Sequence, residues 1–131
     1  KNQTVSRHAF DLMYFTLEKR LMLGRLSVAD ATNLRREHRA ALHRIAMRFQ
    51  FNTAAIVFNL PVDICLQRNA RRERKVPEEA LLLQYDLLKE TLGTIANERF
   101  TSVHLFDEIT QSQVGVTIGP AVSPQLPLPA V

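Results

Sequence analysis

Apolar residues recur along most of the chain at two spacings, and each spacing predicts one kind of element. A helical period of about 3.6 residues predicts four helices. They cover about residues 5–23, about 34–49, a stretch that starts at 61 and runs into the basic residues 68–75, and about 77–97. Gly24 predicts the end of the first helix, and Pro61 and Pro77 predict the starts of the last two. Shorter apolar runs predict strands over residues 26–33, 53–60 and 101–106.

The order of these elements implies right-handed crossovers, so the predicted fold class is α/β, with a parallel sheet flanked by helices. The run 53–60, TAAIVFNL, is apolar enough to be a strand covered on both faces. Three strands are few for such a domain, and a strand from the middle of the sheet is expected to be missing. An unpaired edge along 53–60 would then favour aggregation or require a partner.

The run Leu26-Ser-Val-Ala-Asp-Ala-Thr-Asn33 ends in an acid, a hydroxyl and an amide. Ligands of parallel sheets bind outside the carboxyl ends of the strands, so Asp30, Thr32 and Asn33 are expected to line a functional site. The alternative is that Asp30 and Asn33 cap the helix that begins near Leu34. Both interpretations stay open on the sequence.

The composition is that of one globular domain of 131 residues, of which 46% are hydrophobic. A single cysteine, Cys65, excludes an internal disulfide and a CxxC motif. No run has the roughly 18 apolar residues of a membrane span, and no signal-peptide pattern opens the chain, so a cytoplasmic location without membrane contact is expected. Lys1 in place of Met suggests that an N-terminal part is missing. Glycines and prolines after Asp107 predict a flexible or extended tail over 108–131, which leaves 1–107 as the domain.

Positive charge gathers in two stretches, 35–48 and 68–75, and the net charge of +4 favours anionic partners. The polar face of the helix 34–49 is either a solvated surface or a nucleic-acid contact. It carries Arg35, Arg36, His38, Arg39, His43, Arg44 and Arg48. Because His38 and His43 are five residues apart, they lack the i, i+4 spacing of a metal-binding helix, and we expect no zinc.

In the second stretch, Arg68 and Arg72 would share one face and grip a polyphosphate if the helix persists that far. A solvated charged turn is the alternative. The aromatic residues Phe10, Tyr14 and Phe15 of the first helix are explained more simply by packing against a sheet than by stacking on nucleobases.

Several short fragments occur in one colinear order between about Asn2 and Phe106. They are NQTV (2–5), AFD (9–11), KRL (19–21), LG (23–24), VADATN (28–33), AIVFNLP (55–61) and CLQRN (65–69). Together they resemble the kinase domain of bacterial polynucleotide kinase-phosphatase, a P-loop phosphotransferase that moves the γ-phosphate of ATP to the 5′-hydroxyl of DNA or RNA. The resemblance implies a P-loop kinase-like fold that is incomplete at its N-terminus, ATP and Mg²⁺ as cofactors, and nucleic-acid 5′ ends as partners.

By that resemblance, Arg68 and Arg72 are catalytic arginines of a lid that closes over the ATP phosphates. Asp30 would hold Mg²⁺ through water or orient the acceptor pocket, which Thr32 and Asn33 would line.

The sequence departs from the family's pattern, because it contains no GxxxxGK(S/T) motif. The family's segment with the general-base aspartate and an acceptor-binding arginine is also absent, as is its metallophosphatase domain. Both the motif and the base are expected upstream of Lys1, so the chain alone is expected to be inactive. Two alternatives are a P-loop kinase for nucleosides or other small alcohols, and a noncatalytic remnant that binds nucleic acid through its basic helix.

Overall fold

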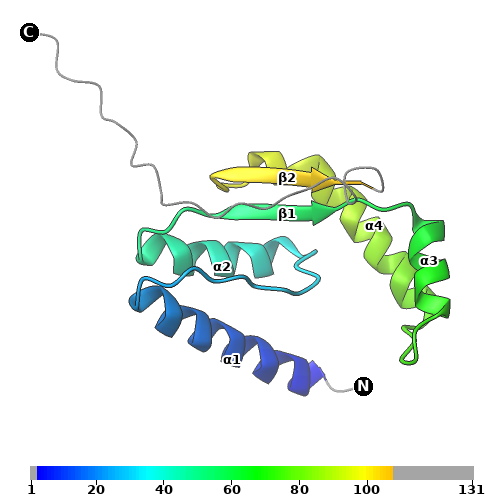
Figure 1. Cartoon of the computed structure of the whole chain (residues 1–131), viewed down its shortest axis with the longest axis horizontal. Coiled ribbons are helices and arrows are strands. Elements are labelled where there is room, and N and C mark those ends of the chain that lie inside the picture. Colours follow the sequence, from blue (N-terminus) through cyan, green and yellow to red (C-terminus); the bar gives the residue numbers. More distant parts are fainter. Residues whose placement is uncertain (1–2, 108–131) are drawn as a thin grey trace, which may run out of the picture.

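The structure is a computed structural model that describes residues 3–107. In chain order its elements are α1 (Gln3–Met22), α2 (Arg36–Arg48), β1 (Ala54–Phe58), α3 (Val62–Ala70), α4 (Glu78–Thr94), the 3₁₀ turn η1 (Ile95–Asn97) and β2 (Ser102–Phe106) (Figure 1). The predicted α/β class is confirmed, because the two strands are parallel and helices flank them. The predicted tail, 108–131, lies outside the described residues.

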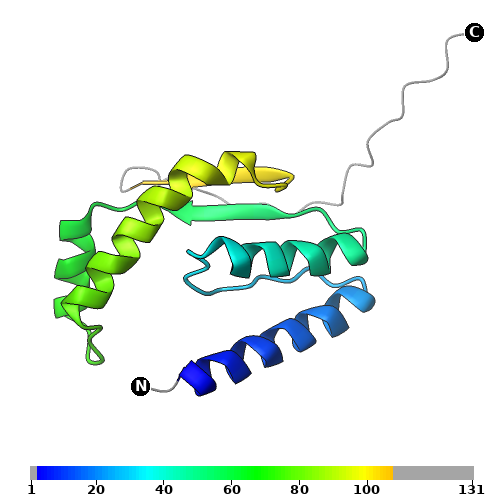
Figure 2. The same ribbon diagram turned by 180° about the vertical axis from the view of Figure 1, so that it is seen from behind.

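The sheet consists of β1 and β2, paired in register from Ala54 opposite Ser102 to Phe58 opposite Phe106. The amide of Asn59 extends the ladder by donating to the carbonyl of Phe106 at 2.8 Å. Parallel neighbours need a long crossover, and here α3 and α4 supply it. Figure 2 shows α4 running back across the molecule from α3 towards the start of β2.

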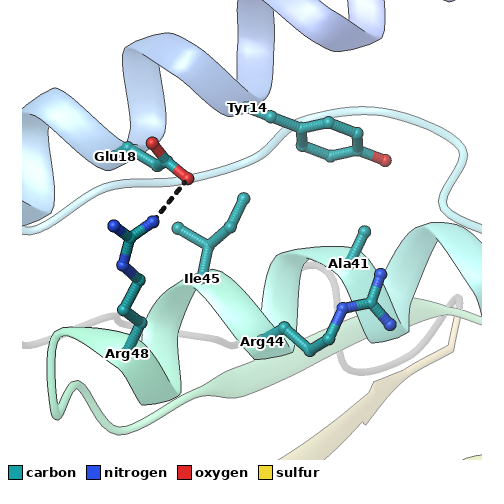
Figure 3. Close-up of a pocket in the computed structure, with 6 residues that line it drawn as sticks. All are labelled: Tyr14, Glu18, Ala41, Arg44, Ile45 and Arg48. Carbon is teal, nitrogen blue, oxygen red and sulfur yellow. Dashed lines mark ion pairs between the residues drawn. The ribbon is translucent and has the colours of Figure 1, made fainter.

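Helices α1 and α2 lie side by side, and α2 is the main neighbour of α1 among the described elements (Figures 1 and 2). Ile45 projects from α2 into the seam between them (Figure 3). The ring of Phe10 lies 4.6 Å from that of His38 on α2 and 6.1 Å from that of Tyr14, centroid to centroid. The prediction that these aromatic residues pack against a sheet is therefore wrong, because Phe10 and Tyr14 face α2 and Phe15 is 57% exposed.

Residues 26–33 do not form the predicted buried strand. The chain leaves α1 at Gly24, which has a φ of +66° as the predicted stop required, and then runs back without strand pairing. Leu26 is 58% exposed and Val28 is 85% exposed. A strand requires the backbone of a partner, and within residues 3–107 no other segment pairs with this one. Its apolar residues therefore stay open to solvent.

The core of the described residues is small. Leu21, Ala46, Leu60 and Ile95 are its buried apolar residues. Side chains alternate in burial along β1, so Ile56 is 53% exposed and Phe58 is 59% exposed. The prediction that this strand is covered on both faces is wrong for the described residues. Within residues 3–107, no helix has the length and apolar character to cross a membrane.

Candidate functional site

The basic loop, defined here as residues 68–75, begins in the last turn of α3. The helix starts after Pro61, as predicted, but it ends at Ala70, and Arg71 is its C-terminal cap. The amide of Arg72 donates to the carbonyl of Asn69 at 3.1 Å, in a turn beyond the helix. The condition for Arg68 and Arg72 to share a helix face is therefore not met, and the two side chains start from different local structures.

Asn69 closes this loop by bonding to the backbone of Val76 at two points. Its Nδ2 donates to the carbonyl of Val76 at 2.8 Å, and its Oδ1 accepts from the amide of Val76 at 2.9 Å. Sequence reasoning did not single out Asn69. The available signal was an amide near a helix end, followed by a polar run and a proline, because asparagine side chains commonly bond to nearby backbone in turns.

The charged side chains of the basic loop are exposed. None of them makes a side-chain hydrogen bond or an ion pair with another residue in the described part of the chain. They are Arg68, Arg71, Arg72, Glu73, Arg74 and Lys75. Unpaired guanidinium groups retain all their donors, and their planar geometry matches two oxygens of a phosphate. The loop therefore offers an exposed cationic surface on a base that is fixed by Asn69.

The second predicted site is the loop at residues 29–34, which precedes α2. Asp30 and Thr32 are exposed there. Asn33 has a φ of +44°, and its Nδ2 donates to the carbonyl of Ala29 at 3.1 Å, so its side chain folds back on the loop. The Oδ1 of Asn33 is buried without a partner among the described residues. Asn33 thus shapes the loop that carries Asp30 and Thr32.

Helix capping does not account for these residues. The N-cap of α2 is Arg35, and no side chain makes a capping hydrogen bond there. The alternative role of Asp30 and Asn33 as caps is therefore wrong.

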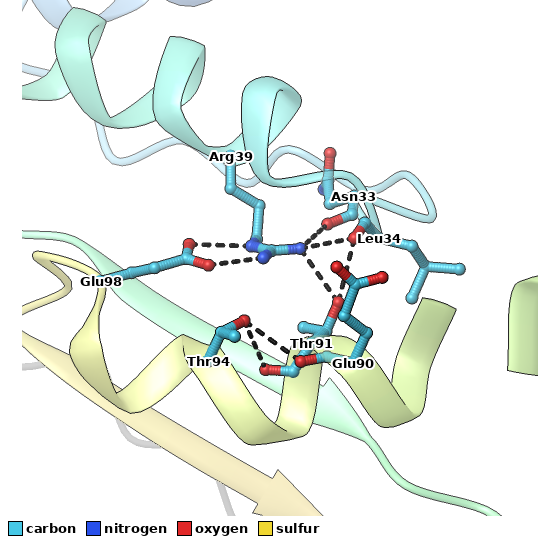
Figure 4. A network of polar contacts seen from close by, with 7 residues as sticks. All are labelled: Asn33, Leu34, Arg39, Glu90, Thr91, Thr94 and Glu98. Atoms are coloured by element: carbon cyan, nitrogen blue, oxygen red, sulfur yellow. Dashed lines mark hydrogen bonds and ion pairs between the residues drawn. The ribbon is translucent and has the colours of Figure 1, made fainter. Parts of the chain in front are cut away.

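Behind this loop lies Arg39, which sequence analysis placed on the polar face of the helix. It is only 5% exposed. Its Nε and Nη2 donate to the two carboxylate oxygens of Glu98, and its Nη1 donates to the carbonyls of Asn33 at 2.9 Å and Leu34 at 2.8 Å (Figure 4). Nη1 also lies 3.2 Å from the Oγ1 of Thr91. Placing Arg39 on an exposed face was wrong, because all its nitrogens are engaged inside the protein.

This network joins three segments that are distant in sequence. The Oγ1 of Thr91 on α4 donates to the carbonyl of Leu34 at 3.0 Å, and Glu98 follows η1. The hydrogen bond from Arg39 holds the pKa of Glu98 below its usual range, although burial opposes that shift. A sequence signal existed: Arg39 precedes Leu42 by three residues and Ala46 by seven, which is the spacing of the apolar stripe.

The loop before α2 and the basic loop after α3 both lie towards the side on which β1 ends (Figure 1). No hydrogen bond or ion pair joins Asp30 or Thr32 to the basic loop within residues 3–107. In the same part of the chain, no three His, Cys, Asp or Glu side chains gather closely enough to hold a metal ion.

Comparison with protein families gives a match over most of the chain. The family model for an AAA domain, AAA_33, matches residues 1–92, which is more than half of the chain. The matched span includes the loop at 29–34, Arg39 and the basic loop. No curated protein matches the chain.

Proposed function

The chain belongs to the AAA domain family, whose members are P-loop nucleotide-binding domains of the kinase type, and on that premise we propose that it works in ATP-dependent phosphoryl transfer to a polynucleotide 5′-hydroxyl. Family membership supports the nucleotide-binding, kinase-type part of this proposal. The polynucleotide acceptor rests on the resemblance of the fragments between residues 2 and 69 to polynucleotide kinase domains.

The observation that carries the proposal is the basic loop. Catalysis of phosphoryl transfer consists mainly of positioning and of stabilising charge on the transferring group. Exposed arginines without protein partners supply that charge. The two hydrogen bonds between Asn69 and Val76 hold the loop only at its base, so the loop can close over a nucleotide. Arg68 and Arg72 therefore bind the phosphates of ATP, and Arg68, on the last turn of α3, is the better anchored of the two.

The described residues fit one part of an ATP site. The guanidinium groups of the basic loop are suitable ligands for a polyphosphate. The backbone cradle and lysine of a GxxxxGK(S/T) motif do not occur in the printed sequence. Asp30 is a single exposed carboxylate, so its part in holding Mg²⁺ runs through water. The magnesium ion would supply charge neutralisation on the phosphates.

The acceptor is assigned to the loop at 29–34, where Thr32 contacts it and Asn33 keeps the loop in shape. In the transfer, the bond between the γ-phosphorus and the β,γ-bridging oxygen breaks and ADP leaves. The 5′-oxygen bonds to the γ-phosphorus, and the hydroxyl proton passes to a general base.

The test uses the protein as its gene encodes it, with γ-labelled ATP and two acceptors, a 5′-hydroxyl oligonucleotide and a free nucleoside. We expect labelling of the oligonucleotide, a loss of at least tenfold in kcat/KM for Arg68→Gln, and no change for Arg25→Gln, which removes an exposed arginine outside both loops. The chain of 131 residues by itself should transfer no phosphate.

Preferential labelling of the nucleoside would assign the protein to the small-alcohol kinases instead. Absence of transfer to either acceptor would leave the family's nucleotide binding and overturn the proposed reaction.

A further inference from the structure

A groove runs along the seam between α1 and α2, apart from the two loops described above. It has a volume of about 400 Å³, which is within the range of ligand sites. Figure 3 shows the six residues that line it: Tyr14, Glu18, Ala41, Arg44, Ile45 and Arg48. Figure 1 shows α1 and α2, which form this seam, as the two helices below the sheet, and the basic loop at the end of α3.

The two arginines of the groove differ in their partners. Arg48 pairs with Glu18 of α1 at 3.5 Å between Nη1 and Oε1 (Figure 3). Arg44 is exposed and makes no hydrogen bond or ion pair with any other residue between 7 and 107. The groove therefore holds one neutralised arginine and one arginine with all its donors available, which is an electrostatic arrangement suited to an anion.

The walls of the groove are aromatic and aliphatic. The half-buried ring of Tyr14 extends along the seam in the same direction as Arg44, Ala41 lies between them, and Ile45 lies nearer to Glu18 and Arg48 (Figure 3). Burial raises the pKa of Tyr14, and the charge of Arg44 offsets part of that rise. The Tyr14 hydroxyl has no hydrogen-bond partner in the described part of the chain, so it keeps a donor for a ligand.

We propose that this groove binds a segment of single-stranded nucleic acid, with a backbone phosphate on Arg44 and a base against the ring of Tyr14. A free guanidinium beside an aromatic ring matches the phosphate and the flat base of one nucleotide. An acidic peptide would use the guanidinium but would leave the ring and the aliphatic wall without a matching group. The chain's net charge of +4 adds a general attraction for nucleic acid.

The proposal does not depend on phosphoryl transfer, and its test omits ATP. Binding of a fluorescein-labelled dT12 oligonucleotide to the chain is followed by anisotropy at several salt concentrations. We expect Arg44→Gln to weaken binding at least fivefold and to lower the slope of log Kd against log salt by about 0.7, the contribution of one phosphate contact on a single strand. Arg25→Gln, at an exposed arginine outside the groove and both loops, should lower affinity by less than twofold.

The aromatic contact has its own readout, because Tyr14 and Tyr85 are the two tyrosines of the chain and it has no tryptophan. Unlabelled dT12 should quench tyrosine fluorescence in the wild type and in Tyr85→Phe, and this quenching should disappear in Tyr14→Phe, which keeps the ring and its packing. Tyr14→Leu should weaken binding by about 5- to 100-fold, the usual range for losing one stacked base.

If Arg25→Gln weakened dT12 binding as much as Arg44→Gln, the binding would be diffuse and electrostatic, and the groove proposal would be overturned. Polyglutamate and unlabelled dT12 are also compared as competitors of labelled dT12. If both displace it at the same concentration of negative charge, the groove is a surface for acidic peptides instead. Failure of the wild type to bind dT12 at low salt would also overturn the proposal. A loss of phosphoryl transfer in Arg68→Gln, with dT12 binding unchanged, would separate this site from the proposed kinase function.

Discussion

Two sets of arginines look alike in the sequence and have opposite surroundings in the structure. Arg39 lies among six other basic residues on a helix, yet it is buried, and Glu98, Asn33, Leu34 and Thr91 occupy its donors. The arginines of the basic loop also belong to a charged run, but they are exposed and unpaired within residues 3–107. Arg39 is committed to holding the fold, whereas the basic-loop arginines are available to a ligand.

The difference shows that the partners of an arginine, and not the local density of charge, decide its role. A buried guanidinium is tolerated only where hydrogen bonds and a counterion compensate for lost hydration. Arg39 meets that condition by joining the loop at 29–34 to α4 and to Glu98, and so it fixes the backbone that carries Asp30 and Thr32. The arginines of the basic loop are exposed and keep their hydration.

The largest expected effect follows from breaking the buried pair. Glu98→Gln would leave the charge of Arg39 buried without a counterion and should lower the free energy of unfolding by about 3–5 kcal/mol. Urea denaturation followed by circular dichroism measures this change. The matched control, Glu73→Gln, removes an exposed glutamate of the basic loop and should stay within about 0.5 kcal/mol of the wild type. Similar losses in both variants would contradict the contrast between the two regions.

The basic loop should respond in ligand affinity and not in stability. In the protein as its gene encodes it, Arg68→Gln should weaken ATP binding by about 10- to 100-fold, because a hydrogen bond to a charged group contributes about 1.5–3 kcal/mol. Its urea midpoint should match that of the wild type. Isothermal titration with ATP and with AMP provides the measurement. If the two ligands lose affinity equally, Arg68 does not contact the outer phosphates.

A smaller effect is expected at the base of the loop. Asn69→Ala removes both bonds to Val76 and should cost about 1–3 kcal/mol, since each hydrogen bond contributes about 0.5–1.5 kcal/mol. Hydrogen exchange of residues 70–76 should accelerate in this variant. Asn52→Ala, at an exposed asparagine without a side-chain bond in the described structure, is the control. Unchanged hydrogen exchange in Asn69→Ala would show that the two bonds between Asn69 and Val76 do not hold the loop.

The smallest expected effect is the loss of stability of the protein at acidic pH. Because the folded-state pKa of Glu98 is lowered, its ionised form contributes stability above the unfolded pKa, and this contribution is lost as pH falls through the folded pKa. Stability should therefore fall below about pH 4.5, where an unfolded glutamate begins to take up protons. Urea midpoints between pH 3 and pH 7 should show a steeper fall in the wild type than in Glu98→Gln. Parallel curves would show that Glu98 is not responsible.

The open face of β1 stands apart from both arginine regions. Ile56 and Phe58 are largely exposed there, although the sequence predicts them to be covered. Their exposure leaves these two positions of β1 open within residues 3–107.

The sequence by itself determined the features that depend on neighbours along the chain. The period of apolar residues gives the four helices, Gly24 ends α1, and Pro61 and Pro77 precede α3 and α4. The alternation of helices and strands gives the parallel pair β1–β2. These features follow from backbone geometry and local side-chain preferences, which act over a few residues.

Only the tertiary structure decided the features that need a distant partner. Residues 26–30 have the composition of a strand but pair with no strand between residues 3 and 107, and Arg39 is buried because Glu98, far along the chain, meets it. The groove beside Tyr14 exists because α1 lies on α2. Strand pairing, burial of charge and helix packing are set by contacts between remote segments, and a local pattern does not contain the position of the partner.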